Sequence, residues 1–200
     1  MAAYIAFEGG EGSGKSTQAS RVAERIDAVL TREPGGTPLG GELRGLLLNT
    51  DSYSVGPRAE ALMMAADRAQ HLQDLILPAL SQGRHVVSDR SAYSSLAYQG
   101  GGRELGVEAI RSVNDWAIYG RWPDLVVYLR VPREIAVTRL NRSLDRFEQE
   151  GEGFHTRVAS TFDQLAMEDD ERWLVVDGSG SIDDVAAEVW DRLKPALDAL

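Results

Sequence analysis

Short apolar runs alternate along the chain with longer segments in which apolar residues recur every three or four positions. The apolar runs predict strands at 4–8, 28–31, 85–88, 125–129 and 173–176. The longer segments predict helices at 15–26, 38–48, 57–81, 91–99, 106–120, 132–142, 151–169 and 181–199, with a kink or early end at Pro78. Such alternation is typical of the α/β class, in which helices flank a parallel sheet. The sheet of this chain is predicted to have five strands.

Glycine and proline clusters separate the predicted elements. They are Pro34-Gly35-Gly36, Gly100-Gly101-Gly102 and Gly151-Glu152-Gly153. None is long enough to link two domains, so residues 1–200 are expected to form one domain. In an open α/β sheet, ligands bind beyond the carboxyl ends of the strands, and residues with useful chemistry should follow them.

A complete phosphate-binding motif, G-x-x-x-x-G-K-[ST], follows the first predicted strand and opens the first helix. It consists of Gly9, Gly10, Glu11, Gly12, Ser13, Gly14, Lys15 and Ser16, with Thr17 next. The loop amides and the helix N-terminus attract phosphate, Lys15 reaches the outer phosphates, and the Ser16 hydroxyl suits Mg²⁺. A glycine-rich turn without a ligand is the alternative, but the flanking strand and helix favour nucleoside triphosphate binding.

Asp89 and Arg90 end the third predicted strand. An aspartate there is placed to hold Mg²⁺ and its waters opposite Ser16. The alternative is that Asp89 only caps the following helix. Arg90 offers a two-pronged donor for a second phosphate group.

Further cationic residues lie on the polar stretch after the fourth strand and its helix. Arg142 and Arg146 belong either to a lid that closes over the phosphates or to an ordinary solvated loop. Arg68, on an otherwise apolar helix face, either pairs with an acid such as Asp67 or reaches a ligand. The three histidines lack metal-ligand spacing and are interpreted as structural, with His71 on a helix surface.

Composition narrows the classes of partner. The chain has 21 basic and 31 acidic residues and a net charge of −10, which argues against a protein that binds a nucleic-acid backbone. It has no cysteine, which excludes disulfides and fits a reducing compartment. No targeting signal or membrane-length apolar run is present, so we expect a cytoplasmic protein with no membrane partner.

The motifs in chain order resemble bacterial thymidylate kinase. The resemblance covers about residues 4–195, and Arg32-Glu33-Pro34-Gly35-Gly36 together with Asp89-Arg90 and Ser94-Ser95-Leu96-Ala97-Tyr98-Gln99 are its specific parts. It implies the phosphate-loop NTPase fold of nucleoside monophosphate kinases, with a short lid at about 141–152. It also implies transfer of the ATP γ-phosphate to thymidine monophosphate (dTMP) with Mg²⁺, in a homodimer.

Roles follow from this resemblance position by position. The phosphate loop through Thr17 holds ATP, and Ser16 and Asp89 hold the metal. Glu11 matches an acid near the sugar 3′-hydroxyl, and Tyr98 matches an aromatic that disfavours a 2′-hydroxyl. The other substrate-binding positions grip the phosphate (Arg90, Arg32), read the thymine edge (Arg68, Ser95, Gln99), line the base pocket (Arg44) or pack on the substrate (Pro34).

Two positions depart from patterns in that family. Some relatives carry a catalytic arginine inside the phosphate loop where this chain has Gly12, and those without it use a lid arginine. Arg146 is then the first choice for this role and Arg142 the second. Met64 stands where a phenylalanine usually stacks on thymine, which leaves selectivity for the base open.

Rival functions remain at this stage. Another nucleoside or nucleotide kinase would share the fold, although Arg90 and Arg32 favour a phosphorylated acceptor. A nucleotide-dependent switch would need a guanine-reading Asn-Lys-x-Asp segment, which the sequence lacks. A regulatory relative that binds dTMP without turnover is disfavoured by the intact Lys15, Ser16, Asp89 and Arg90.

Overall fold

A parallel sheet of five strands forms the centre of the molecule. The structure, a computed structural model, describes residues 1–48, 54–140 and 145–200. The strand order is β2-β3-β1-β4-β5, and every neighbouring pair is parallel. The strands are β1 (Tyr4–Glu8), β2 (Val29–Arg32), β3 (Val86–Asp89), β4 (Leu125–Arg130) and β5 (Trp173–Asp177), each within one or two residues of its predicted range.

Helices connect these strands. In chain order they are α1 (Lys15–Arg25), α2 (Pro38–Leu48), α3 (Pro57–His71), η1 (Leu72–Ile76), α4 (Leu77–Ser81), α5 (Ala92–Ser95), η2 (Leu96–Gly102), α6 (Val107–Ala117), α7 (Arg133–Thr138), α8 (Glu152–Glu168) and α9 (Ile182–Asp198), where η marks a π-helix. The predicted helix at 132–142 is shorter, and its last residues lie outside the described ones.

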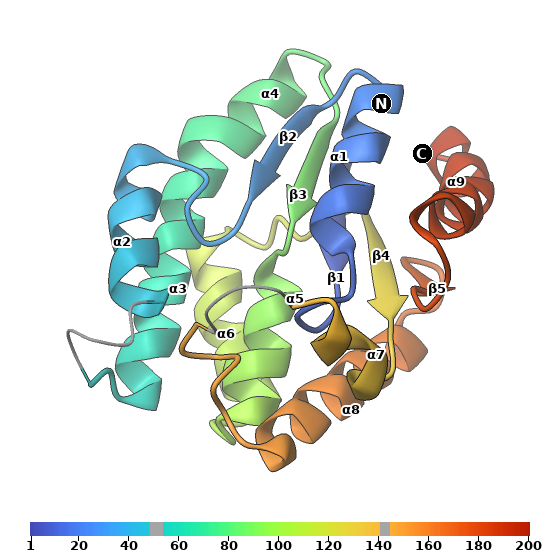
Figure 1. Ribbon diagram of the computed structural model, residues 1–200. Helices are drawn as coiled ribbons and strands as arrows, with labels where there is room; N and C mark the ends of the chain where they lie inside the picture. The colour runs from blue at the N-terminus through green and yellow to red at the C-terminus, as the bar shows by residue number, and fades with distance from the viewer. Residues whose placement is uncertain (49–53, 141–144) are drawn as a thin grey trace.

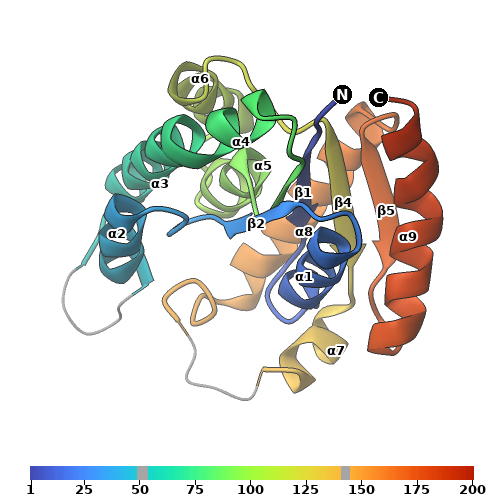
Figure 2. The same ribbon diagram turned by 90° about the horizontal axis from the view of Figure 1, so that it is seen from above.

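The two faces of the sheet carry separate apolar cores. On one face, Ala19 and Val22 of α1 and Val189 of α9 pack on residues such as Ile5 and Val127. On the other face, α3, α5, η2, α6 and α8 cover the sheet, and Figure 2 shows α3, α5 and α6 on the side away from α1. Continuous burial of β1 on both faces explains why its sequence is apolar without alternation.

The register aligns the carboxyl ends of the central strands. Phe7 of β1 and Arg32 of β2 both lie beside Asp89 of β3. β1 leads into α1 on one face, whereas the adjacent β3 leads into α5 on the other. Connections that diverge in this way open a crevice at the ends of the two strands, which is where such sheets bind ligands.

The interruption expected at Pro78 takes the form of a π-helical turn. The Leu77 N–H bonds the Leu72 carbonyl five residues back, and Pro78, which has no N–H, follows directly. The helix then ends at Ser81, as predicted for the whole segment.

The prediction that Gly100-Gly101-Gly102 separates two elements was wrong, because these glycines lie in η2. A Cβ on Gly101 would lie 2.0 Å from Thr161 Oγ1 of α8. Glycine therefore allows η2 to approach α8 closely, and the helix expected over 91–99 extends to Gly102.

Candidate active site

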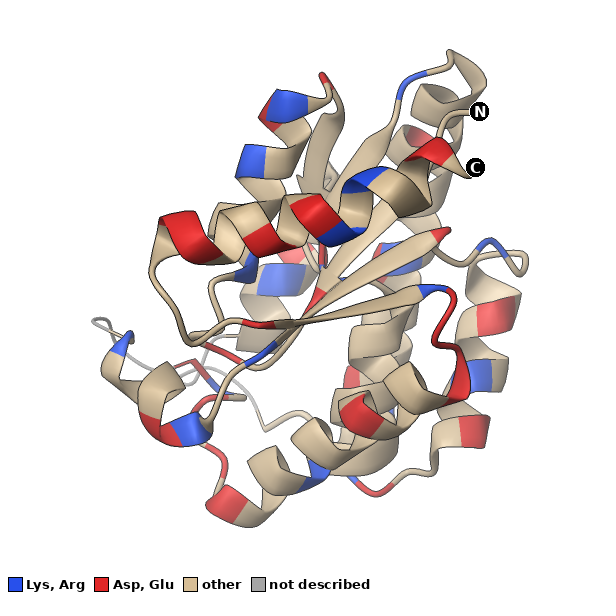
Figure 3. Cartoon of the chain, turned by 90° about the vertical axis from the view of Figure 1, so that its right-hand side faces the viewer, with Lys and Arg blue, Asp and Glu red and all other residues tan. Residues whose placement is uncertain are grey.

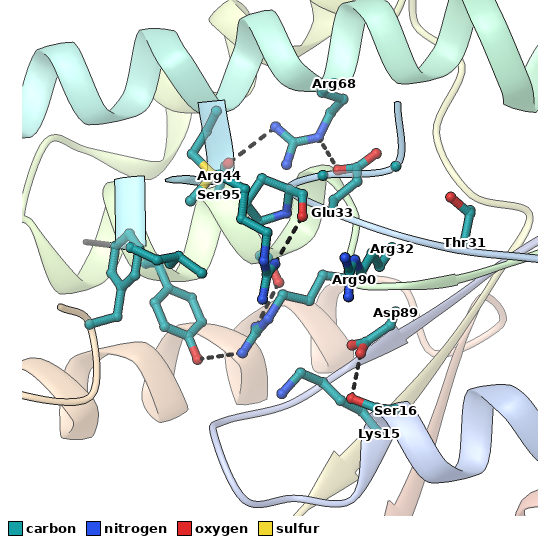
Figure 4. Close-up of a pocket in the computed structure, with 18 of the residues that line it drawn as sticks. Lys15, Ser16, Thr31, Arg32, Glu33, Arg44, Arg68, Asp89, Arg90 and Ser95 are labelled. Atoms are coloured by element: carbon teal, nitrogen blue, oxygen red, sulfur yellow. Dashed lines mark hydrogen bonds and ion pairs between the residues drawn. The ribbon is translucent and has the colours of Figure 1, made fainter. Parts of the chain in front are cut away.

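A pocket of about 570 Å³ opens at the carboxyl ends of β1, β2 and β3. Figure 4 shows Lys15 and Ser16 at one end and Arg68 with Ser95 at the other, with Arg44 and Arg90 between them. The predicted site residues that line it are Glu11, Lys15, Ser16, Arg32, Pro34, Arg44, Met64, Arg68, Asp89, Arg90, Ser95, Tyr98 and Gln99. The sequence thus predicted most of the lining from positions scattered over seven helices and strands and the loops between them.

The phosphate loop runs from Gly9 into α1, which begins at Lys15. Gly14 precedes the helix in the left-handed conformation (φ 89°). Lys15 Nζ donates to the Gly10 carbonyl at 3.1 Å and lies 3.6 Å from Glu11. Burial, together with the nearby charge of Arg90, lowers the pKa of Lys15. A phosphate would offset both effects, because it supplies negative charge next to the ammonium group.

Gly12 meets the backbone of α7. Its φ is 73°, and a Cβ there would lie 2.2 Å from the Ala136 carbonyl oxygen. Any side chain at position 12 would require α7 to shift, which accounts for glycine at this point of the loop. Gly9, Gly10, Ser13 and Gly14 belong to the same loop, whereas Thr17 lies exposed on α1, outside the pocket lining.

Ser16 and Asp89 meet across the crevice. Ser16 Oγ donates to Asp89 Oδ2 at 2.5 Å, and the buried Asp89 Oδ1 has no hydrogen-bond partner among the described residues. A hydroxyl and an unpartnered carboxylate oxygen fit Mg²⁺, which takes few protein ligands and uses phosphates and waters for the rest. Within the described ranges, no group of three or more acidic, histidine or cysteine residues forms a larger cation site.

The alternative role of Asp89 as a helix cap is excluded. Ser91 is the residue that caps α5, and its Oγ accepts from the Tyr93 N–H at 3.3 Å. Asp89 instead ends β3 with its side chain in the pocket.

Arg90 occupies the middle of the pocket in a strained backbone conformation, with φ of 76°. Its guanidinium donates to the Gly9 carbonyl at 3.3 Å, to Ser94 Oγ at 3.0 Å and to Tyr98 Oη at 3.1 Å, and it forms an ion pair with Glu11. A non-glycine residue is held at positive φ only where its surroundings over-determine it, and such strain is concentrated at functional sites.

The charges around Arg90 are strongly coupled. Burial works to lower the pKa of Arg90, but the carboxylates of Glu11 and Asp89 outweigh it and raise the pKa. Burial also raises the pKa of Tyr98, against the opposing charge of Arg90. Both groups are thus fixed in one protonation state near neutral pH, Arg90 as a cation and Tyr98 as a neutral phenol.

Arg32 and Arg44 bring two more cations to the same region. Arg32 ends β2 and is exposed toward the pocket. Arg44 of α2 donates to the Pro34 carbonyl at 2.9 Å. Burial lowers the pKa of Arg44, and the charges of Arg32 and Arg90 lower it further. Three arginines that repel one another form a region suited to a doubly charged anion.

Arg68 is held at the opposite end by a buried network. Its Nε donates to Glu33 Oε2 at 2.6 Å, and its other nitrogens donate to Ser95 Oγ (3.1 Å), the Ser91 carbonyl (3.1 Å) and Asn114. Its acidic partner is therefore Glu33, and Asp67 accepts from the Gly35 N–H instead, at 2.9 Å. Arg68 both pairs with an acid and lines the pocket.

Glu33 joins this network to His71. Glu33 Oε1 lies 2.9 Å from His71 Nδ1, and His71 Nε2 lies 2.7 Å from Thr31 Oγ1. Burial works to raise the pKa of Glu33, but the charge of Arg68 and the contact with His71 outweigh burial and lower it. The prediction that His71 lies on a helix surface was wrong, since it is fully buried.

Gln99, Met64 and Tyr98 also line the pocket. Gln99 Nε2 donates to Glu60 Oε1 at 2.9 Å. Two further serines support the floor, where Ser91 and Ser94 donate to the buried Glu8 at 2.7 and 2.6 Å.

The predicted lid arginines are placed differently from the residues above. Arg146 donates to the Val55 carbonyl at 2.5 Å and lies 3.7 Å from Glu60, so it does not line the pocket. Its neighbours Asp145 and Phe147 do. Arg142 lies outside the described residues.

Sequence reasoning missed several residues of this site. Glu33 and Ser94 stand inside the quoted motifs but received no role, and Glu60 had no signal beyond being an acid in a helix. Arg130, whose role the sequence alone does not indicate, ends β4 and forms an exposed ion pair with Asp163 of α8, in which Nη2 and Oδ2 lie 2.9 Å apart.

Comparisons with known proteins agree with this geometry. Residues 7–189 match the protein family described as Thymidylate kinase. A thymidylate kinase of Halothermothrix orenii is 43% identical over 97% of both chains, and one of a Synechococcus strain is 45% identical over 97% of this chain and 95% of its own. A crystal structure of thymidylate kinase from Ehrlichia chaffeensis superposes with a TM-score of 0.80 at 31% identity, covering 96% of this chain and 98% of that one.

No helix in the described part of the chain is both long and apolar enough to cross a membrane. On the side of the molecule that Figure 3 presents, acidic and basic positions are interspersed rather than gathered into a basic face.

Proposed function

The chain belongs to the thymidylate kinase family, whose reaction is the phosphorylation of dTMP to dTDP with ATP as co-substrate, and we propose that the pocket described above is where it performs this reaction. One observation carries the assignment. A phosphate-loop lysine and serine lie at one end of a single pocket, a buried arginine with hydrogen-bonding neighbours lies at the other, and Arg90 lies between them.

The monophosphate of dTMP is assigned to the arginines in the middle of the pocket. Arg90 grips it, with Arg32 and Arg44 adding positive charge. Arg90 is already oriented by Gly9, Ser94 and Tyr98, which reduces the conformational entropy lost when it binds phosphate. Glu11, its present ion-pair partner, is assigned to the sugar 3′-hydroxyl, and Tyr98 to the sugar face where a ribonucleotide has an extra hydroxyl.

The thymine base is assigned to the end formed by Arg68, Ser95 and Gln99. Four of the five N–H groups of Arg68 donate hydrogen bonds to other described residues. The fifth, on Nη2, is left to donate to the O4 carbonyl of thymine. Met64 packs on the ring face in place of an aromatic side chain. Pro34, whose carbonyl accepts from Arg44 of α2, packs on the substrate.

ATP is assigned to the phosphate loop, from Gly9 to Thr17, with Lys15 at the outer phosphates. Mg²⁺ is assigned to Ser16 Oγ and Asp89, where the unpartnered Oδ1 supports it. When bound, Mg²⁺ neutralises charge on the β- and γ-phosphates.

The proposed reaction needs no nucleophile from the protein. A phosphate oxygen of dTMP forms a bond to the γ-phosphorus while the bond from that phosphorus to the β–γ bridging oxygen breaks, which releases ADP. Lys15 and Arg90 hold the two reacting phosphates in line and offset their charge. The oxygen that attacks is already anionic, so no general base is required.

The charge that develops during transfer is assigned to a lid arginine, with Arg146 preferred over Arg142. Arg146 must leave Val55 and Glu60 to reach the phosphates. Because Gly12 has no room for a side chain, position 12 of the loop cannot supply an arginine for this role. The lid, at about 141–152, remains part of this proposal.

A homodimer and a cytoplasmic location also remain proposals. Three large apolar side chains are exposed on the adjacent helices α3 and α6 or just after α6, namely Leu62, Trp116 and Tyr119. They support a dimer interface on that side of the molecule. The absence of cysteine supports a reducing compartment.

The test is a coupled ADP-release assay with ATP and Mg²⁺. It compares dTMP with deoxyuridine, deoxycytidine, guanosine and adenosine monophosphates and with free thymidine, and uses Lys15→Ala as the inactive control. Preference for dTMP is expected. Preference for another acceptor would keep the kinase mechanism but contradict the base assignments of Arg68, Ser95 and Gln99.

A further inference from the structure

Glu60 of α3 is a buried carboxylate that has no role in the reaction proposed above. Only 1% of it is exposed, and it lies behind the pocket wall rather than in it. Its Oε1 accepts from Gln99 Nε2 at 2.9 Å and from Arg103 Nε at 3.2 Å. Its Oε2 accepts from Arg103 Nη2 at 3.0 Å and lies 3.7 Å from Arg146 Nη2.

These contacts determine which groups Glu60 can offer. Arg103 donates to both carboxylate oxygens, and a guanidinium has no acceptor, so a proton on either oxygen would break an ion pair. Glu60 therefore presents only acceptors to its neighbours. Arg103 is itself held by Glu150, which keeps the cation in place from the far side.

The amide of Gln99 can satisfy an acceptor in only one orientation. Its NH₂ group must face Glu60, and its Oε1 is then the atom left for the pocket that Gln99 lines. Among the described residues, Glu60 is the one side chain that hydrogen-bonds this amide. The buried carboxylate thus decides whether the pocket meets a donor or an acceptor at this position.

We propose that Glu60 is a positioning residue that sets base specificity by locking Gln99 with its oxygen toward the base; this inference rests on the proposed function. A pyrimidine with an N3–H, such as thymine or uracil, donates to that oxygen. Cytosine presents a lone pair at N3, which the oxygen repels. Discrimination between thymine and cytosine at N3 is then controlled by a residue that touches neither base.

The geometry gives a directional prediction for Glu60→Gln. The Oε2 position faces Arg103 Nη2 at 3.0 Å, Arg103 Nε at 3.2 Å and Arg146 Nη2 at 3.7 Å, all of which can only donate, so the new amide keeps its oxygen there. Its NH₂ then takes the place of Oε1 and faces Gln99, at the loss of the contact from Arg103 Nε to that atom. Gln99 then turns its own oxygen to this new NH₂ group and its own NH₂ to the pocket. The pocket would now offer a donor to the base, which suits cytosine N3 rather than thymine N3–H.

The experiment measures dissociation constants of dTMP, dCMP and dUMP by calorimetry, with kcat and KM for dTMP, in the full-length protein. In Glu60→Gln, the ratio of the dCMP to the dTMP dissociation constant is expected to fall about tenfold or more, since one base-edge pair discriminates by ~1–3 kcal/mol. The dUMP to dTMP ratio should stay unchanged, because both bases carry the same N3–H. Thermal melting verifies that each variant is folded. If Glu60→Gln does not fold, Glu60→Asp replaces it as the test variant, because the shorter side chain withdraws the acceptor from Gln99 but keeps the charge.

Two variants act as controls. Glu104→Gln removes the charge of an acid that is adjacent to Arg103 in sequence but pairs with Arg157, and it should keep the ratio of wild type. Gln99→Leu removes the reading amide and should lower it. An unchanged ratio in Glu60→Gln would overturn the inference. A fall in kcat with no change in the ratio would also overturn it, and would assign Glu60 to the lid through its contact with Arg146. An unchanged ratio in Gln99→Leu would also overturn it, whereas failure of wild type to phosphorylate dTMP would overturn the proposed function itself.

Discussion

Glu33 Oε2 lies 2.6 Å from Arg68 Nε, in an ion pair whose side chains are 1% and 4% exposed. The pair joins the end of β2 to α3 and aims Arg68 at the base end of the pocket. His71 occupies the second oxygen of Glu33, so the carboxylate is satisfied on both sides. A buried charge with these partners is important for stability as well as for recognition.

Glu33→Gln is expected to destabilise the fold by about 3–5 kcal/mol, because removing one partner leaves the other charge buried and uncompensated. Urea unfolding at pH 7 measures this loss. The same variant should raise KM for dTMP, since Arg68 loses the contact that orients it.

Asp163→Asn is the matched control for this loss. It breaks the ion pair with Arg130, in which the side chains of Arg130 and Asp163 are 62% and 32% exposed, and should cost about 0–1 kcal/mol. Equal losses in the two variants would show that the Glu33–Arg68 pair is no more important than a surface contact.

The pH dependence of the Glu33 contribution has a definite sign. Arg68 and His71 outweigh burial and lower the pKa of Glu33 in the folded state. The unfolded chain therefore takes up a proton first, at the ordinary glutamate value of about 4.3, and the contribution of Glu33 is lost as pH falls below it. The difference in unfolding free energy between wild type and Glu33→Gln should be constant from pH 7 to 5 and shrink toward pH 3. A difference that grows on acidification would contradict this assignment.

The limits of sequence reasoning are visible at this same pair. The strand boundaries and the phosphate loop could be predicted because apolar periodicity and the spacing of Gly14, Lys15 and Ser16 are local properties. The partner of Arg68 is not local. Asp67 is adjacent in sequence but points to Gly35, whereas Glu33 comes from another element 35 positions away.

Packing also reverses what composition indicates. Gly100-Gly101-Gly102 has the composition of a loop, yet it forms the end of η2, and the missing side chains of Gly101 and Gly102 allow that helix to lie close to α8. His71 and Glu60 carry no sequence signal of burial, since polar residues at single helix positions are usually exposed. Their partners come from β2, η2 and the segment after residue 145, which only the folded chain brings together.

Asp89→Asn is expected to weaken the Mg²⁺ dependence of turnover while preserving the contact with Ser16, because the amide oxygen still accepts from the Ser16 hydroxyl. Loss of a carboxylate near the metal should raise the Mg²⁺ concentration for half-maximal activity by about 10–100-fold, the range typical for groups that support metal sites. Turnover measured across a Mg²⁺ titration tests this. Asp163→Asn is the control, because Asp163 lies outside the pocket lining, and its Mg²⁺ titration curve should match that of wild type. An unshifted titration curve for Asp89→Asn would remove Asp89 from the metal site.

Arg146→Ala tests the source of the catalytic cation. If Arg146 leaves Val55 and Glu60 to reach the transferred phosphoryl group, its loss should lower kcat by about 10³-fold, as removal of an arginine from phosphoryl transfer commonly does. KM for dTMP should change much less, because Arg146 does not line the pocket in this conformation. The ADP-release assay with saturating dTMP and ATP gives kcat, and a dTMP titration gives KM.

Arg130→Ala is the matched control, since it removes an arginine that is exposed and paired with Asp163 outside the pocket lining. Its kcat should equal that of wild type. Near-normal kcat in Arg146→Ala would transfer the role to Arg142, and the Arg142→Ala variant would then show the loss. If neither variant loses activity, Lys15 and Arg90 suffice for the developing charge and the lid is not catalytic.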